Sequence, residues 1–361
     1  MKAAVCRELH KPLAIETVDI DAPAPFEVLV RTVASGVCHS DLHALHGTIG
    51  ARVPGIFGHE PAGIIEAVGS AVTTVKPGDH VIACTSMYCG NCTQCLSGWT
   101  HLCTNRAACL RPKGSKPRLS KGGETIAQFA DLASFAEKML VHERNVVKIS
   151  EDIPLDRAAL VGCAVTTGVG AALNTAQVTP GSSVAVFGAG GVGISVIQGA
   201  RIAGARQIIA VDLLDHKLEV AKKFGATETL NGKSGDVVKE LKRLSGGGVD
   251  FAFDAIGNKQ VTEQCFYALA PRGLAMIVGV LPPGEKLELN PGHFFVEKRI
   301  QGSFMGSNRF HLDMPRYLEL YRQGKLNLDD MISRRGRLED VNEAFRAMAA
   351  GEVTRTVLMF D

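Results

Sequence analysis

The sequence carries almost no net charge. Its 361 residues include 39 lysines and arginines against 37 aspartates and glutamates, a net charge of +2 with histidine neutral. Such a balance provides no electrostatic reason to bind nucleic acid or an anionic membrane surface. Hydrophobic residues make up 46% and charged residues 21%, as in ordinary globular proteins. We therefore expect any partner to be recognised at a specific site rather than by overall charge.

A long run of apolar residues is also lacking. Charge returns at Arg7 and Glu8 before a signal-peptide core can form, and no later run approaches the ~18 apolar residues that a membrane helix needs. These absences favour a cytoplasmic protein without a membrane partner. Ten cysteines are far below the density of a disulfide scaffold, and in a reducing compartment clustered cysteines more often bind metal or do chemistry.

The length allows two domains with sizeable cores. Short strands broken by glycine and proline fill residues 1 to about 150, which predicts a mostly antiparallel, barrel-like unit. From about residue 166, strands alternate with helices, which predicts a doubly wound parallel sheet of the α/β class. The last fifty residues hold two predicted helices and a closing strand, and we expect them to pack back on the first unit. The predicted strands include 27–35, 63–68, 80–84, 184–187, 207–211, 249–255, 275–280, 300–304 and 355–360, and the last helices are 315–322 and 339–350.

A glycine-rich turn follows the apolar strand at 184–187. It reads Gly-Ala-Gly-Gly-Val-Gly over residues 188–193 and leads into a predicted helix, the context of a dinucleotide-binding motif. Gly188 permits the turn, Gly190 lets the backbone approach a pyrophosphate, and Gly193 lets the helix pack close to the strand. The free N–H groups and the helix dipole favour the phosphate charge.

Asp212 ends the next predicted strand, nineteen residues after Gly193. A carboxylate at this place accepts hydrogen bonds from a ribose 2′-hydroxyl and repels a 2′-phosphate, which favours NAD over NADP. The alternative is a tight strand-to-helix turn that binds nothing, but the strand, helix, second strand and terminal acid all occur in register. The sequence therefore predicts an NAD site.

Four cysteines lie close together at Cys89, Cys92, Cys95 and Cys103. Two C-x-x-C steps fold around one ion, and a fourth thiolate closes a tetrahedron without an open position, as a structural zinc requires. The alternative of buried or disulfide-paired cysteines is weak, because closely spaced cysteines seldom fill a core. We expect a structural zinc here.

A second set of metal-binding residue types is dispersed along the chain. Cys38, His59 and Cys163 each lie within two residues of a glycine and close to a strand-like run, so three distant loops can converge on one ion. Two cysteines and a histidine leave a fourth position for water or substrate. From spacing alone, each residue is more often a buried thiol or a satisfied histidine.

The whole chain resembles the zinc-dependent medium-chain alcohol dehydrogenases. Four motifs carry the resemblance in the expected order: GVCHSDLH at 36–43, GHEPAGIIEAVG at 58–69, the four-cysteine loop, and VFGAGGVG at 186–193 followed by Asp212. The resemblance implies a GroES-like barrel domain joined to a Rossmann-type domain. It also implies that Cys38, His59 and Cys163 hold a catalytic zinc, that Glu60 is a nearby or transient ligand, and that Asp41 orients the histidine.

The same resemblance implies a proton relay and further cofactor contacts. Ser40 would take the proton of the substrate hydroxyl and pass it through the nicotinamide ribose to His43, and His39 would lie against the pyrophosphate. A capped helix start is a compatible alternative for Ser40 and His43. Four weaker assignments can equally be surface charges or packing residues: Lys217 on the adenosine ribose, Thr167 and Val192 near the nicotinamide, and Arg355 on a phosphate.

We therefore expect an NAD-dependent, zinc-containing alcohol dehydrogenase with one catalytic and one structural zinc per chain. A zinc ion would act as Lewis acid on the alcohol oxygen while hydride leaves to NAD⁺, in a cleft between the two domains. The alternatives are a thiol-adduct formaldehyde dehydrogenase of the same family and a nicotinoprotein that retains its NAD. A non-enzyme alternative is a zinc-stabilised nucleotide sensor, which an open zinc site with a proton relay argues against.

The expected substrate depends on what two positions lack. Family members that act on a thiol adduct of formaldehyde use an acid before the GHE motif and an arginine after the structural zinc loop, where this chain has Ile49 and Ala107. Arg106 is one position away, and a basic loop begins at Arg111, for which a solvated surface loop is the better interpretation. Ile49, with Phe135 near the pocket, predicts an apolar slot for primary aliphatic or aromatic alcohols.

The resemblance also sets the expected domains and assembly. We expect a catalytic zinc-binding domain at 1–165, a Rossmann NAD-binding domain at 166–305 and a C-terminal segment at 306–361 that returns to the catalytic domain. The sixty residues between Cys103 and Cys163 resemble the dimeric members of the family. We therefore expect a homodimer, formed through edges of the two nucleotide-binding sheets.

Overall fold

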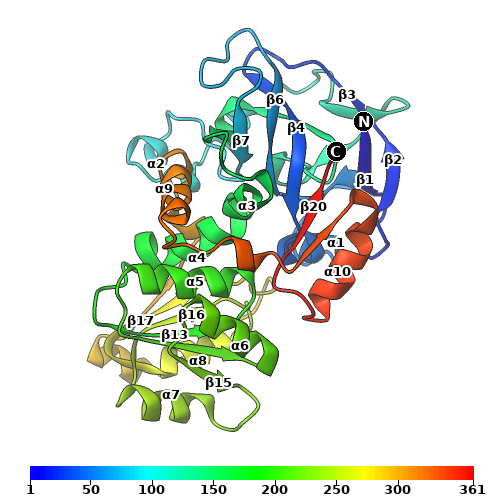
Figure 1. Ribbon diagram of the computed structural model, residues 1–361. Coiled ribbons are helices and arrows are strands. Elements are labelled where there is room, and N and C mark those ends of the chain that lie inside the picture. The colour runs from blue at the N-terminus through cyan, green and yellow to red at the C-terminus, as the bar shows by residue number, and fades with distance from the viewer. The chain divides into compact units, whose positions relative to one another are not determined.

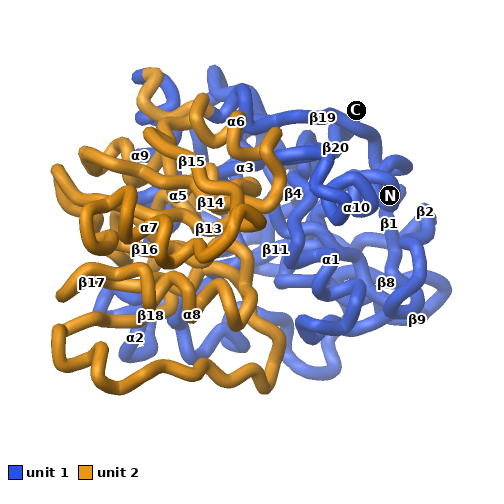
Figure 2. The backbone as a smooth tube through the Cα atoms, turned by 90° about the horizontal axis from the view of Figure 1, so that it is seen from below, with its two compact units in different colours: residues 1–163, 309–323, 328–361 blue, residues 164–308, 324–327 orange.

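A computed structural model describes all residues from Met1 to Asp361. The chain divides into two compact units (Figures 1 and 2). Unit 1 comprises residues 1–163, 309–323 and 328–361, and unit 2 comprises residues 164–308 and 324–327. The C-terminal segment thus returns largely to unit 1, where its last strand joins a sheet begun by the N-terminal residues.

Unit 1 is built from three sheets whose strands are mostly antiparallel. Its largest sheet has the order β12-β7-β6-β4-β20-β19, with β11 also paired to β4. The smaller sheets have the orders β10-β5-β1-β2 and β3-β8-β9. Only the β5–β10 and β19–β20 pairs are parallel. The strands are β1 (Lys2–Cys6), β2 (Ala14–Thr17), β3 (Asp19–Ile20), β4 (Glu27–Gly36), β5 (Gly55–Ile56), β6 (Glu60–Val68), β7 (His80–Ala83), β8 (Leu119–Lys121), β9 (Glu124–Thr125), β10 (Ala127–Gln128), β11 (Lys138–His142), β12 (Val146–Lys148), β19 (Arg334–Gly336) and β20 (Thr356–Met359).

The central strand of unit 1 is β4, which pairs with β6, β11 and β20. Its Val28, Val30 and Ala34 side chains are buried, and both edges of the strand are paired. Phe135 lies in the unit 1 core with no exposed surface and its ring 6.0 Å from that of Phe345. The expectation that Phe135 lines a substrate pocket is therefore corrected, because its side chain fills the core.

Unit 2 contains a six-stranded sheet with the order β15-β14-β13-β16-β17-β18, and all its strand pairs are parallel. Helices α5 and α6 contact each other, as do α7 and α8, so the crossover helices form pairs (Figure 1). The strand order and the parallel pairing confirm the predicted doubly wound α/β class. The strands are β13 (Ser183–Phe187), β14 (Gln207–Asp212), β15 (Glu228–Asn231), β16 (Val249–Asp254), β17 (Leu269–Ile277) and β18 (Arg299–Gly302).

The helices follow the predicted positions with two exceptions. The segment around Cys163 is helical rather than a loop, and the helix predicted at 315–322 begins five residues earlier, with Pro315 inside it. The α-helices are α1 (His39–Leu45), α2 (Thr93–Leu96), α3 (Leu155–Leu160), α4 (Thr166–Gly170), α5 (Gly191–Ile202), α6 (Asp215–Phe224), α7 (Val237–Ser245), α8 (Lys259–Tyr267), α9 (Phe310–Arg322) and α10 (Val341–Ala349).

One continuous helical segment, Leu155–Thr175, is long and apolar enough to cross a membrane by length and composition alone. The expectation that no segment of the chain is long and apolar enough for a membrane helix is therefore corrected. The glycines, threonines and Cys163 of this segment interrupt the apolar run, but the mean hydropathy of its best window is still 1.4. Within the protein 83% of that window is buried, which is the environment of a core helix.

Candidate active site

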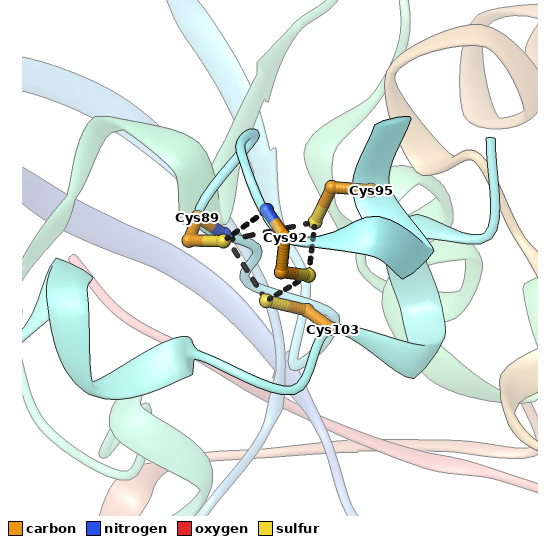
Figure 3. A group of neighbouring side chains, drawn as sticks. All are labelled: Cys89, Cys92, Cys95 and Cys103. Carbon is orange, nitrogen blue, oxygen red and sulfur yellow. Dashed lines mark hydrogen bonds between the residues drawn. The ribbon is translucent and has the colours of Figure 1, made fainter. Parts of the chain in front are cut away.

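The four clustered cysteines converge in a small lobe of unit 1 (Figure 3). The Cys92 sulfur lies 3.4 Å from that of Cys95 and 3.9 Å from that of Cys103, and the Cys89 and Cys95 sulfurs are 3.9 Å apart. A zinc ion bonded to four sulfurs at ~2.3 Å needs sulfurs about 3.8 Å apart at the corners of a tetrahedron. The structure thus brings together all four predicted residues in an arrangement that fits a closed zinc site.

Backbone N–H groups around this lobe stabilise thiolate charge. The Cys89 sulfur accepts hydrogen bonds from the N–H groups of Asn91 and Cys92, and the Cys103 sulfur accepts one from Cys89. Backbone hydrogen bonds, first from Cys95, lower the pKa of Cys92 to about 5, whereas desolvation raises that of Cys95 to about 12. Zinc binds the deprotonated thiolate, so an ion at this point would favour the charged form of the cysteines that hold it.

Arg144 supports the same lobe from η4 (Glu143–Asn145), a residue that no sequence pattern singled out. Its guanidinium donates to the Cys89 carbonyl and lies 5.8 Å from the centre of the Tyr88 ring. A fixed cation here offsets part of the negative charge that four thiolates bring to one ion.

A second convergent group lies in unit 1 at the junctions of three elements. Cys38 precedes α1, His59 and Glu60 lie at the start of β6, and Cys163 lies in the π-helical turn η5 (Val161–Val165). One potential ligand atom from each of the four residues lies within 4.8 Å of the others, and all four side chains are buried. The predicted residues that are far apart in the sequence therefore meet at one point.

The orientation of His59 is set by a buried carboxylate. Asp41 Oδ1 lies 3.0 Å from His59 Nδ1 and also accepts the Gly58 N–H at 2.9 Å. This hydrogen bond leaves Nε2 as the ring nitrogen available to a metal. Burial alone lowers the pKa of His59, but Asp41 and Cys38 more than offset this effect and hold the pKa well above its usual range.

The two thiols of this group influence each other. The hydrogen bond between the sulfurs of Cys163 and Cys38 holds the pKa of Cys38 well below its usual range, with Arg355 and His59 adding to the effect. The same bond and burial raise the pKa of Cys163. One thiolate is thus already favoured at this point, and a cation would favour both.

Glu60 is the least satisfied polar group of the site. Its carboxylate has no exposed surface, and neither oxygen accepts a hydrogen bond. Burial raises its pKa to about 8, although the guanidinium of Arg355, 3.1 Å from Oε1, favours the charged form. A buried carboxylate with free lone pairs next to two thiols and an imidazole fits a divalent cation, which would take up those lone pairs.

The structure explains why the GVC motif begins with a glycine, Gly36. A Cβ built at this position would lie 2.2 Å from Glu60 Oε2, so any larger residue would displace the carboxylate. Because Gly36 has no side chain, the Glu60 carboxylate can stay within 4.8 Å of the ligand atoms of Cys38, His59 and Cys163.

Arg355 lies beside the group formed by Cys38, His59, Glu60 and Cys163. Its side chain is buried, pairs with Glu60 and donates to the Val37 carbonyl at 2.9 Å. The resemblance assigned it to a cofactor phosphate, and that contact stays a prediction. Its position beside Glu60 was not foreseen, because no local pattern links residues 60 and 355.

The residues of the predicted relay lie on α1. Ser40 and His43 are half-buried, His39 is exposed, and the His39 and His43 rings are 6.5 Å apart. The alternative of a Ser40 helix cap is wrong, because Cys38 is the N-cap residue and no side chain caps the helix. Ser40 is therefore available for a role other than capping.

The glycine-rich turn of unit 2 connects β13 to α5. Gly188 has a φ of 93°, which only glycine adopts readily, and a Cβ at Gly193 would lie 1.7 Å from the Gly188 carbonyl oxygen. A Cβ at Gly190 would meet nothing within 4 Å. The first and third glycines thus allow the turn and the close packing, while the second leaves open space at the N-terminus of α5, where a phosphate fits.

Asp212 lies beside this turn, at the carboxyl end of β14. Its Oδ2 accepts the Ala189 N–H at 2.8 Å, and its Oδ1 accepts the N–H groups of Leu213 and Leu214 at 2.8 and 3.1 Å. These bonds fix the carboxylate against the glycine-rich loop. Lys217 lies one helical turn further on in α6.

Thr167 and Val192 also belong to unit 2. The Thr167 hydroxyl donates to the Met305 sulfur at 3.6 Å, and a Cβ on the adjacent Gly168 would lie 2.4 Å from the Val192 carbonyl oxygen. The two segments that carry Thr167 and Val192 are therefore in close contact. Met305 is a contact of Thr167 that no motif indicated.

The chain matches two family models and close relatives over nearly its whole length. Residues 24–151 match the alcohol dehydrogenase GroES-like domain, and residues 191–323 match the zinc-binding dehydrogenase family. An S-(hydroxymethyl)glutathione dehydrogenase of Saccharomyces cerevisiae is 38% identical over 370 residues, which cover 99% of this chain and 96% of the relative.

Two solved structures share the fold. An alcohol dehydrogenase zinc-binding domain protein from Burkholderia ambifaria is 36% identical with a TM-score of 0.95, covering 100% of this chain and 98% of that one. Benzyl alcohol dehydrogenase from Acinetobacter calcoaceticus is 33% identical with a TM-score of 0.94, covering 100% and 99%. With two convergent metal-binding groups and a Rossmann-type sheet on the same chain, this protein belongs to the zinc-dependent medium-chain alcohol dehydrogenases, whose cofactors are zinc and NAD.

Proposed function

We propose that this enzyme interconverts apolar primary alcohols and aldehydes with NAD. The observation that carries the proposal is the buried group of Cys38, His59, Glu60 and Cys163, whose ligand atoms lie within 4.8 Å of one another. Two thiols and an imidazole leave one coordination position for the substrate oxygen. A zinc ion held there supplies the Lewis acidity that lowers the pKa of an alcohol.

The chain's own residues prepare this site. Asp41 fixes the His59 ring so that Nε2 faces the cluster, and Arg355 holds Glu60 as a nearby carboxylate. Glu60 accepts no hydrogen bond, so its carboxylate keeps lone pairs that a metal ion can use while Arg355 holds it nearby. These contacts support the assignment of Cys38, His59 and Cys163 as permanent ligands, with Glu60 as a transient one.

We assign the closed group Cys89, Cys92, Cys95 and Cys103 to the structural zinc. With NAD bound, Ser40 would accept the proton of the alcohol and hand it on toward His43, and His39 would contact the pyrophosphate. Asp212 would select NAD by accepting hydrogen bonds from the ribose hydroxyls, assisted by Lys217. Gly188, Gly190 and Gly193 shape the phosphate loop, and Thr167 and Val192 line the nicotinamide pocket. We assign the catalytic zinc-binding domain to residues 1–165, the NAD-binding domain to 166–305 and the returning C-terminal segment to 306–361.

An apolar substrate is supported by the residues where an adduct-binding enzyme would carry charge. Ile49 is half-buried just after α1, and Ala107 is exposed in η2 (Arg106–Cys109). The neighbouring Arg106 is already engaged by the Thr85 carbonyl and by Asp131 at 3.2 Å. Arg111, which begins the basic loop, is held by Glu27 and Asp21 rather than exposed as a solvated charge. Both arginines are thus neutralised by the protein itself.

A thiol-adduct formaldehyde dehydrogenase is the second candidate. It is favoured by the S-(hydroxymethyl)glutathione dehydrogenases at 38% identity, against 33% for benzyl alcohol dehydrogenase. The difference in identity is small, and both activities use the same zinc and NAD chemistry. Ile49 and Ala107 favour the first candidate, because an apolar side chain and a methyl group do not bind the charged ends of glutathione.

A substrate series tests the proposal. An apolar slot rewards each buried methylene by ~0.8 kcal/mol, about fourfold in binding, so kcat/KM should rise from ethanol to hexanol, with benzyl alcohol also good. Formaldehyde with glutathione should give little NADH. The variant Arg106→Gln should change neither activity, because the guanidinium pairs with Asp131. A tenfold preference for the glutathione adduct over hexanol, lost in Arg106→Gln, would establish the second candidate instead.

We also propose a cytoplasmic location and a homodimer. The location is supported by the absence of any disulfide among the ten cysteines, which is usual in a reducing compartment. The edge strand β18 of the parallel sheet is largely exposed and can pair with a second copy.

A further inference from the structure

Four of the eleven histidines gather at α1 and the segments next to it. His39 and His43 lie within the helix, His46 follows its last residue, and the His10 N–H donates to the Leu45 carbonyl at the end of the same helix. His10, His39 and His46 are exposed, and His43 is half-buried. The concentration of imidazoles exceeds what a single proton relay uses.

The four rings form two pairs with different geometry. His39 and His43 are four residues apart on the helix, with ring centres 6.5 Å apart and planes tilted by 44°. His10 and His46 are stacked with centres 6.1 Å apart and planes within 6° of parallel. The nitrogen lone pairs of an imidazole lie in the ring plane, so stacked parallel rings direct them side by side, whereas tilted rings can direct them to one point.

We propose that His39 and His43 bind a borderline divalent cation such as Ni²⁺, Zn²⁺ or Cu²⁺, at a site separate from the two zinc groups. Histidines at positions i and i+4 on one helix face are a bidentate metal-binding arrangement. A metal–nitrogen bond of ~2.0–2.1 Å brings two chelating rings to centres about 5 Å apart. A change of rotamer at the exposed His39 and the half-buried His43 closes the remaining distance, and water completes the coordination.

The consequence for turnover rests on the proposed function. His43 is the proposed outer member of the proton relay, and His39 is the proposed pyrophosphate contact. A cation held by both imidazoles would occupy the lone pair that accepts the proton and would alter the pyrophosphate position. Excess Ni²⁺ or Zn²⁺ would therefore inhibit the enzyme in competition with NAD⁺.

The test measures metal binding directly in the zinc-replete enzyme. Calorimetric titration with Ni²⁺ should reveal one additional ion per chain while the zinc content stays constant. His39→Gln and His43→Gln should each weaken Ni²⁺ binding by about tenfold or more, because each removes one arm of the chelate. The matched control His46→Gln, at the end of the same helix, should bind Ni²⁺ within about twofold of the wild type.

Equal Ni²⁺ affinity in wild type, His39→Gln and His43→Gln would overturn the site, as would weakening by His46→Gln alone. Inhibition is read separately. If Ni²⁺ binds with the expected dependence on both histidines but leaves NAD⁺ kinetics unchanged, the metal site stands and the proposed roles of His39 and His43 in turnover fail. If Ni²⁺ inhibits wild type but not His43→Gln, both hold.

Discussion

At the scale of single residues, Asp212 is the carboxylate that we propose to set cofactor choice. Both oxygens are already oriented by backbone N–H groups, and their remaining lone pairs can accept from ribose hydroxyls. Replacing Asp212 with Ser removes the repulsion of a 2′-phosphate. We expect the ratio of kcat/KM for NADP⁺ over that for NAD⁺ to rise by about tenfold or more.

The matched control for this prediction is Asp215→Ser. Asp215 begins α6 three residues later and accepts a hydrogen bond from Asn231. Its replacement removes a carboxylate from the same surface but leaves the proposed ribose contact in place. Cofactor preference should not change in this variant. A wild-type enzyme that already prefers NADP⁺ would show that the role assigned to Asp212 is wrong.

The relay can be tested at two other residues. Ser40→Ala should lower kcat by about 100-fold, because this hydroxyl is the group proposed to touch the alkoxide. His43→Gln should lower it by only about tenfold, since solvent can partly replace the outer member. Steady-state kinetics at saturating NAD⁺ measures both. Wild-type activity in Ser40→Ala would remove the relay from the mechanism.

Mutation should distinguish the roles of the two metal-binding groups, because one is expected to affect stability and the other turnover. Cys92 lies in a short lobe with few buried residues, and the closed site ties that lobe together, so Cys92→Ser should lower the apparent Tm by about 5–15 °C. Cys38 lies at the start of α1 in a buried group, and Cys38→Ala should abolish turnover, on the order of 1,000-fold or more, in a folded protein.

Metal analysis provides the check on both variants. The wild type should contain two zinc ions per chain, and each variant should lose mainly the ion whose ligand was removed. Calorimetry and activity then assign the loss of stability to one site and the loss of turnover to the other. One zinc per wild-type chain would contradict the assignment of two metal groups.

At the scale of elements, the limits of strands and helices were predicted unevenly: the strand predicted at 275–280 begins six residues earlier, at Leu269. The pattern at 184–187 gave β13 within one residue, because an uninterrupted apolar run between turn residues leaves few alternatives. The segment around Cys163 was taken for a loop because of its glycines, but it is helical and buried, where packing overrides low helix propensity. Proline at residue 315 suggested a helix start, whereas the helix begins at Phe310 and tolerates the proline in its second turn.

The site itself was partly predictable for a related reason. The spacing of the four clustered cysteines points to a metal directly, whereas Cys38 and His59 were assigned through the motifs that resemble the family. The Glu60–Arg355 ion pair and the Arg144 contact to the Cys89 carbonyl join residues distant in sequence. Such contacts depend on the return of β20 to β4 and on the path of the lobe, which local patterns do not encode.

At the scale of the whole molecule, the exposed edge of the parallel sheet points to an assembly. β18 ends the sheet, and η7 (Pro291–Val296) directly before it presents Phe295 with 91% of its surface exposed. An exposed edge strand next to a large apolar side chain is unfavourable in a monomer. Pairing of β18 with its copy across a two-fold axis would join two sheets into one and cover this edge.

We therefore expect light scattering to give twice the chain mass of 38.3 kDa. Phe295→Asp should shift this value toward the monomer, because it places a charge in the proposed interface, while the fold is preserved since the side chain is already exposed. Leu96→Asp is the matched control: this leucine is 75% exposed in the four-cysteine lobe of unit 1, and its replacement should leave the dimer intact. A tetramer mass, or dissociation by Leu96→Asp but not by Phe295→Asp, would move the interface away from β18.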